Sequence, residues 1–211
     1  MPTTYTGYVS GSATKSPGLT LVSRDGRAYR FDAGALCMEL LTTGGPGEFA
    51  RYEVLREPAD LARWADRSRL PPGLEVAVTE GELAQTRAFR DALFQLAADR
   101  VAGRAPNAGH LAVVNAAAAG APLAARVEAD GSRGWVPGAT GAGLLATVAR
   151  DAVELLTGPY ADRIRECGAH NCRLLFVDTS RPGRRRWCAM EHCGNRHKVR
   201  AHRARRAEAD D

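Results

Sequence analysis

Short apolar runs separated by turn residues predict two β-hairpins in the first 160 residues. In two places an Asp-Gly pair lies between such runs: Asp25-Gly26 between 19–23 and 27–31, and Asp130-Gly131 between 123–129 and 134–136. Asp-Gly supplies the positive backbone torsions that a tight hairpin turn requires, so the pair is a strong short-range signal for this motif.

Much of the sequence between and after these hairpins has apolar residues at the spacing of an α-helix. Thr79 and Glu82 have the spacing of a capping box, and apolar residues then recur at helical intervals as far as Gly103. We predict that this segment is the longest helix. Shorter helices are predicted at 32–42, 59–67, 108–119 and 144–156. The larger part of the chain therefore has the pattern of an α+β domain, with hairpins and several helices.

The positive charge of the chain is concentrated near its end. Hydrophobic residues make up 45% and charged residues 25% of the 211, which is typical of a globular protein. Thirteen Lys or Arg and three acids between Arg163 and Arg206 give this stretch a net charge of +10, whereas residues 1–162 carry −2. Such a block favours a phosphate-bearing partner, because neutralising phosphates releases counterions. The alternative is a solvated charged face.

Four of the five cysteines share this basic stretch. They form two C-x4-C pairs separated by fifteen residues: Cys167 with Cys172, and Cys188 with Cys193. Two such pairs suit a structural Zn²⁺ ion, which binds four thiolates tetrahedrally. The competing interpretation is two disulfides. His170 and His192 lie inside the pairs and are spare donors, and Cys37 is expected to be a buried apolar residue.

The residues around the cysteines predict a treble-clef-like zinc finger. Residues 174–177 and 184–187 flank turn residues, which predicts a hairpin between the two cysteine pairs, with Trp187, Phe176 and Leu174 in a small core. Residues 196–206 lack Gly and Pro and predict a basic helix beginning at Cys193 or Gly194. The candidate nucleic-acid contacts are Arg184, Arg185, Arg186, Arg196, Lys198, Arg200, Arg203, Arg205 and Arg206. We therefore divide the chain into residues 1–160, the terminal segment 161–206 and an acidic tail 207–211.

The terminal segment resembles the CGNR zinc finger family. The resemblance covers Cys167, the run from Cys172 to Ser180, and the run from Arg184 to Lys198 with its Cys193-Gly194-Asn195-Arg196 motif. It implies that the four cysteines are the zinc ligands and that the protein is a bacterial transcription regulator. Asp178, Ser180 and Asn195 also match the family pattern. We expect Asp178 and Ser180 to shape a turn and Asn195 to cap the helix.

The preceding part resembles the ABATE domain. Residues 31–43 and 55–64 carry this resemblance, although Glu39 and Thr42 stand where the family typically has Asp and Asn. It implies a stress-induced transcription regulator, with residues 1–160 as a sensing or dimerisation domain. Arg87, Arg90 and His110 are candidates for a pocket that binds an anionic small molecule; the alternative is that all three are solvated surface residues.

These observations favour a zinc-dependent DNA-binding protein rather than an enzyme. The chain has no Gly-rich phosphate loop, His-Glu-x-x-His or Gly-x-Ser-x-Gly motif. An apolar membrane span and a secretory signal are also absent from the sequence, so we expect a cytoplasmic protein. A homodimer formed through residues 1–160 would add selectivity for DNA. Two alternatives remain: binding to structured RNA, and a finger that serves protein interaction beside a ligand-binding domain.

Overall fold

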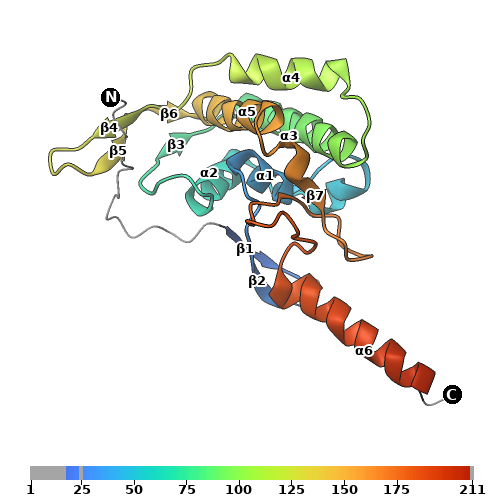
Figure 1. Cartoon of the computed structure of the whole chain (residues 1–211). Helices are drawn as coiled ribbons and strands as arrows, with labels where there is room; N and C mark the ends of the chain where they lie inside the picture. Colours follow the sequence, from blue (N-terminus) through green and yellow to red (C-terminus); the bar gives the residue numbers. More distant parts are fainter. Residues whose placement is uncertain (1–17, 24–25, 210–211) are drawn as a thin grey trace, which may run out of the picture.

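A bundle of helices forms the centre of the computed structural model, which describes residues 18–23 and 26–209 (Figure 1). The two longest central helices are α3 (Glu80–Val101) and α5 (Gly141–Thr157). Helix α4 (Ala108–Ala118) packs against both, while α1 (Leu36–Leu40) packs against α5 and α2 (Pro58–Arg67) against α3. Short 3-10 turns follow at Leu41–Thr43, Gly47–Tyr52 and Ala161–Arg163. The predicted helices are confirmed, with boundaries shifted by a few residues.

The strands form four separate pairs among the described residues. Antiparallel pairs join β1 (Leu19–Val22) to β2 (Ala28–Phe31), β4 (Ala125–Val127) to β5 (Arg133–Trp135), and β7 (Ile164–Glu166) to β8 (Leu175–Val177). A short parallel pair joins β3 (Val76–Ala77) to β6 (Ala139–Thr140). The first two antiparallel pairs are the two predicted hairpins, although Asp25 of the first turn lies outside the described residues. The predicted α+β class is confirmed.

The capping box at the start of α3 also links this helix to α5. The Thr79 hydroxyl oxygen accepts a hydrogen bond from the Glu82 backbone N–H at 3.3 Å, and the Glu82 carboxylate accepts one from the Thr79 N–H at 2.8 Å. The other Glu82 oxygen accepts from the Ala142 N–H in the first turn of α5. The box therefore satisfies free donors at the beginning of two central helices.

The terminal segment shares the apolar core of the rest of the chain. Ile164, Phe176 and Val177 are buried in one continuous cluster with residues of α1, α3 and α5. The Val177 N–H donates to the carbonyl of Ala33 at 2.9 Å, which fixes β8 against the chain just before α1. The division into residues 1–160 and 161–206 stays a prediction, because the two parts are packed on each other.

Helix α6 (Asn195–Ala209) extends away from the body (Figure 1). It continues to Ala209, beyond the predicted end at Arg206. The predicted acidic tail is therefore helical over 207–209, and 210–211 lie outside the described residues. Within the part of the chain that the structure describes, we find no helix with the length and apolar character needed to cross a bilayer.

Candidate zinc centre and nucleic-acid interface

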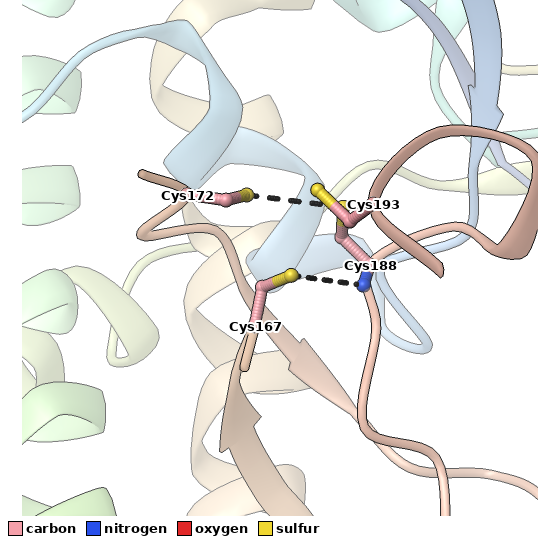
Figure 2. Close-up of side chains that lie close together, drawn as sticks. All are labelled: Cys167, Cys172, Cys188 and Cys193. Atoms are coloured by element: carbon pink, nitrogen blue, oxygen red, sulfur yellow. Dashed lines mark hydrogen bonds between the residues drawn. The ribbon is translucent and has the colours of Figure 1, made fainter. Parts of the chain in front are cut away.

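The four predicted zinc ligands meet at one point (Figure 2). The sulfur atoms of Cys167, Cys172, Cys188 and Cys193 all lie within 4.8 Å of one another. A zinc–sulfur bond of about 2.3 Å places the sulfurs of a tetrahedral site about 3.8 Å apart. The Cys172 and Cys188 sulfurs are separated by 3.8 Å. The spacing of the cluster therefore fits a Zn²⁺ ion.

The four cysteine side chains lie close enough to shift one another's pKa values. Hydrogen bonds from the thiols of Cys172 and Cys188 lower the pKa of Cys167 to about 2. The same sharing raises the pKa of Cys172 to about 12 and raises the pKa of Cys188, while burial raises the pKa of Cys193. The four groups alone thus favour one thiolate and three thiols. A metal cation would hold all four as thiolates, because its charge offsets their mutual repulsion.

The first cysteine pair lies inside the β7–β8 hairpin. Cys167 follows β7, its N–H donates to the carbonyl of Leu174 at 2.9 Å, and its sulfur accepts a hydrogen bond from the Cys188 N–H at 3.3 Å. The prediction that residues 174–177 pair with 184–187 is therefore wrong. β8 pairs instead with β7, because this register buries Phe176 and Val177 in the shared core.

Asp178 organises the loop between β8 and the second cysteine pair. Its buried carboxylate accepts hydrogen bonds from the Ser180 N–H at 3.0 Å, the Ser180 hydroxyl at 2.5 Å and the Arg185 N–H at 2.8 Å. Burial opposes ionisation, but these hydrogen bonds lower the pKa of Asp178 below its ordinary value. The expected structural role of Asp178 and Ser180 in a turn is confirmed.

A π-helical turn, η4 (Met190–Gly194), carries Cys193 into α6. The Gly194 N–H donates to the carbonyl of Ala189, which gives the wider turn. A side chain at Gly194 would begin 3.3 Å from the indole of Trp187 and closer still to Met190. The glycine of the Cys-Gly-Asn-Arg motif thus lets Trp187 pack against the turn. A Cβ atom added at Gly168 would also lie 3.3 Å from the Trp187 indole, at the other edge of the ring.

The helix begins after η4 and not at Cys193 or Gly194. Asn195 already has helical torsions, with φ of −67° and ψ of −39°, so the prediction that Asn195 caps the helix is wrong. The Trp187 ring packs against the ring of His197 in α6 at an angle of 35°, with 4.6 Å between ring centroids. The expected core of Trp187, Phe176 and Leu174 is part of the larger shared core. Both spare histidines have other contacts: His170 lies 3.0 Å from an Arg200 nitrogen and His192 stacks on Tyr29.

The basic residues of the terminal segment fall into two groups. Arg163 and Arg165 donate to backbone carbonyls, and Arg173 pairs with Glu166 at 2.7 Å. These arginines stabilise the segment itself. The exposed residues of the predicted contact set are Arg184, Arg186, Arg196, Lys198, Arg200, Arg205 and Arg206. Arg203 also lies in α6. The exposed positive charge is therefore concentrated on α6 and on the loop that leads to Trp187.

Arg185 differs from the other members of the predicted contact set. Its guanidinium group donates to the carbonyls of Asp32 at 2.8 Å and Trp187 at 3.0 Å, and it lies 4.2 Å from the centre of the Phe176 ring. The group connects the cysteine loop to the chain before α1. Arg185 is thus partly buried with its guanidinium group bonded to backbone carbonyls, and its predicted contact with nucleic acid stays a prediction.

The three candidate pocket residues have different surroundings. Arg87 donates to the carbonyl of Leu55, and Arg90 is buried at 2% exposure with partners Glu53 and Asp91. The alternative that both arginines are solvated is wrong for Arg90, because its ion pairs allow it to be buried. His110 lies on α4, where its Nδ1 atom has no hydrogen-bond partner among the residues that the structure describes. A pocket for an anionic ligand stays a prediction.

The two departures from the ABATE pattern occupy structural positions. Glu39 is fully buried and accepts hydrogen bonds from the Arg69 backbone and side chain at 2.9 and 3.0 Å. Thr42 donates to the carbonyl of Glu39 at 2.7 Å. Burial raises the pKa of Glu39, although Arg69 opposes this shift. Both residues therefore stabilise α1 and the 3-10 turn that follows it.

The hairpin β1–β2 is a neighbour of the zinc centre that the sequence did not reveal. The Arg30 N–H donates to the Glu191 carboxylate at 2.6 Å, and the Tyr29 and His192 rings stack at 4.3 Å with an angle of 9°. Hairpin patterning indicates that strands pair, but it contains no signal for the surface on which the hairpin docks.

An α+β domain packed on a four-cysteine cluster, with an exposed basic helix beside it, defines a zinc-finger protein. Comparison with protein families makes the assignment specific: residues 34–159 match the ABATE family, described as "putative stress-induced transcription regulator", and residues 163–206 match the CGNR zinc finger. The chain belongs to the ABATE family and carries a CGNR zinc finger, whose clustered cysteines indicate a Zn²⁺ site. The family description is that of a transcription regulator. Among proteins of curated function, none matches this sequence.

Proposed function

We propose that the protein is a DNA-binding transcription regulator in which Zn²⁺, held by Cys167, Cys172, Cys188 and Cys193, fixes α6 for contact with duplex DNA. The observation that carries this proposal is the combination of charge and position in α6. The helix contains six Lys or Arg and one acid, Glu208, and it extends away from the body. An exposed cationic helix attracts the phosphate backbone, because binding releases condensed counterions.

The zinc site would set the direction of this helix. Cys193 lies in the turn that leads into α6, and Cys167 and Cys172 lie in the first cysteine pair, which is anchored by β7 and β8. Zinc bound to all four would tie the start of α6 to the hairpin that packs in the shared core. The metal would thus fix the orientation of α6, and the side chains of α6 would contact the DNA.

The proposed contact residues are Arg184, Arg186, Arg196, Lys198, Arg200, Arg203, Arg205 and Arg206. Successive residues of an α-helix are separated by about 100°, so Arg196 and Arg200 share a face while Lys198 and Arg205 lie on the opposite one. Such a distribution suits a helix between two phosphate strands, where both flanks meet negative charge. We also propose that residues 1–160 sense a signal or mediate dimerisation.

The direct test combines Arg205→Glu with Arg206→Glu in the zinc-loaded full chain. A matched control, Arg67→Glu with Arg133→Glu, makes the same change in net charge at exposed positions of α2 and β5. Duplex-DNA affinity is measured across a salt series. We expect the α6 variant to lose about 1.8 from the slope of log affinity against log salt, since each phosphate contact contributes about 0.9. The control should retain the slope.

Two results would contradict the proposal. If the slope of log affinity against log salt were the same for the α6 variant and the wild type, α6 would not contact DNA. Structured RNA that displaces duplex DNA at equimolar concentration would replace the DNA proposal with RNA binding. For the dimer, light scattering at the concentrations of the binding assay should give twice the chain mass, and a monomeric mass would contradict it.

A further inference from the structure

A groove separates the β1–β2 hairpin from the beginning of α6. Its volume is about 590 Å³. One wall comes from residues 27–29 at the start of β2, and the other comes from η4 and the first two turns of α6. In Figure 1 the hairpin lies directly beside the first turns of α6. The hairpin precedes residue 34, so this wall belongs to neither of the two matched family regions.

The groove has arginines on both walls. Arg27 lies on the hairpin side, and Arg196 and Arg200 lie on the helix side; all three are exposed. The stacked rings of Tyr29 and His192 connect the walls. The carboxylate in the lining, Glu191, accepts a hydrogen bond from the Arg30 N–H at 2.6 Å, which holds the hairpin in place. The groove therefore has the chemistry of an anion site with a fixed width.

Asn195 and Arg196 of the Cys-Gly-Asn-Arg motif line this groove, and their side chains do not stabilise the fold. Cys193 belongs to the metal cluster and Gly194 makes room for Trp187. Across residues 18–23 and 26–209, the side chains of Asn195 and Arg196 take part in no hydrogen bond or ion pair, and both are exposed to the groove. Guanidinium and amide donors are the groups that proteins use to bind phosphate oxygens.

We infer that this groove holds a phosphodiester segment of the DNA that α6 contacts, so that Arg27 of the hairpin and Asn195 and Arg196 of the motif grip one strand from two sides. The inference rests on the proposed function. DNA is favoured over a free anion because Arg196 and Arg200 belong both to the groove lining and to the exposed surface of α6. The hairpin then extends the interface beyond the zinc finger itself.

The test uses Arg27→Gln in the zinc-loaded full chain, with Arg133→Gln on the β4–β5 hairpin as the matched control. Both remove one exposed arginine from a two-stranded hairpin. Loss of one phosphate contact reduces the salt slope by about 0.9, so the advantage of the wild type over Arg27→Gln should shrink about 3.5-fold between 50 and 200 mM salt. Arg133→Gln should follow the wild type. Arg27→Lys should restore the slope, because lysine also contacts phosphate.

The outcomes separate this inference from the proposed function. If Arg27→Gln behaves like Arg133→Gln while the Arg205→Glu and Arg206→Glu pair still weakens binding, the groove inference is overturned and DNA binding by α6 stands. If no variant or wild type binds DNA, both are overturned. Melting temperature in inorganic phosphate against chloride at equal ionic strength forms the second arm. A phosphate-specific rise that Arg27→Gln abolishes, with an unchanged DNA slope, would identify a free-phosphate site and refute the DNA occupant.

Discussion

Replacement of Gly34 by alanine tests how the zinc finger is docked on the ABATE domain. Gly34 has a φ of +83°, and an added Cβ atom would lie 2.7 Å from both the Cβ and the carbonyl oxygen of Val177 in β8. Two costs therefore add. The left-handed backbone costs an alanine about 1–2 kcal/mol, and forcing β8 away from a packed core costs about 1–3 kcal/mol more.

Gly131→Ala separates these two costs. Gly131 has a nearly identical φ of +80° in the β4–β5 turn, but among the described residues no atom beyond its two chain neighbours lies within 4 Å of an added Cβ. It should lose only the backbone contribution. Urea unfolding of both zinc-loaded variants should therefore show Gly34→Ala less stable than Gly131→Ala by about 1–3 kcal/mol. Equal losses would show that Val177 does not pack against Gly34 and would refute the docked arrangement.

Three further predictions concern the metal, a buried ion pair and a helix cap. Cys193→Ser should lower the zinc content measured by elemental analysis, whereas Cys37→Ala, at a buried cysteine outside the cluster, should retain it; equal zinc in both would contradict the ligand assignment. Glu53→Gln should cost about 1–3 kcal/mol in urea unfolding at neutral pH, because buried Arg90 keeps only Asp91 as a charged partner. Burial raises the pKa of Glu53, but hydrogen bonds from Arg90 and the Leu55 N–H lower it further, so the folded-state pKa lies below 4.5. The stability from the Glu53–Arg90 ion pair is therefore present above pH 4.5 and is lost as the pH falls through the folded-state pKa. A Glu53→Gln destabilisation that persists unchanged in acid would contradict the pairing. Thr79→Ala should lower the stability by about 1 kcal/mol in the same assay through loss of the α3 cap, and an unchanged stability would contradict the cap.

Local signals made the zinc ligands and the first hairpins predictable. The C-x4-C spacing depends on the reach of two short turns, and the Asp-Gly turns depend on the torsions of two residues. Both are properties of adjacent positions, so the sequence displays them directly. The capping box at Thr79 and Glu82 is local for the same reason.

The pairing of β7 with β8 was not predictable from adjacent residues. Ile164–Glu166 is a three-residue strand, too short to produce a periodic pattern, and its partner is decided by the packing of β8 on α1 and of β7 on α3. The role of Arg185 was hidden by the same kind of tertiary contact. It stands between two exposed arginines in the sequence, and only the fold shows that it reaches the carbonyl of Asp32.

The central claim is that zinc organises α6 into a DNA-binding surface, and the most direct measurement is duplex-DNA affinity of the full chain across a salt series, with and without a chelator. The account predicts steep loss of affinity with salt, loss of binding on chelation and recovery when Zn²⁺ is restored. Affinity that persists unchanged after the metal is removed, or that is absent even at low salt, would contradict it.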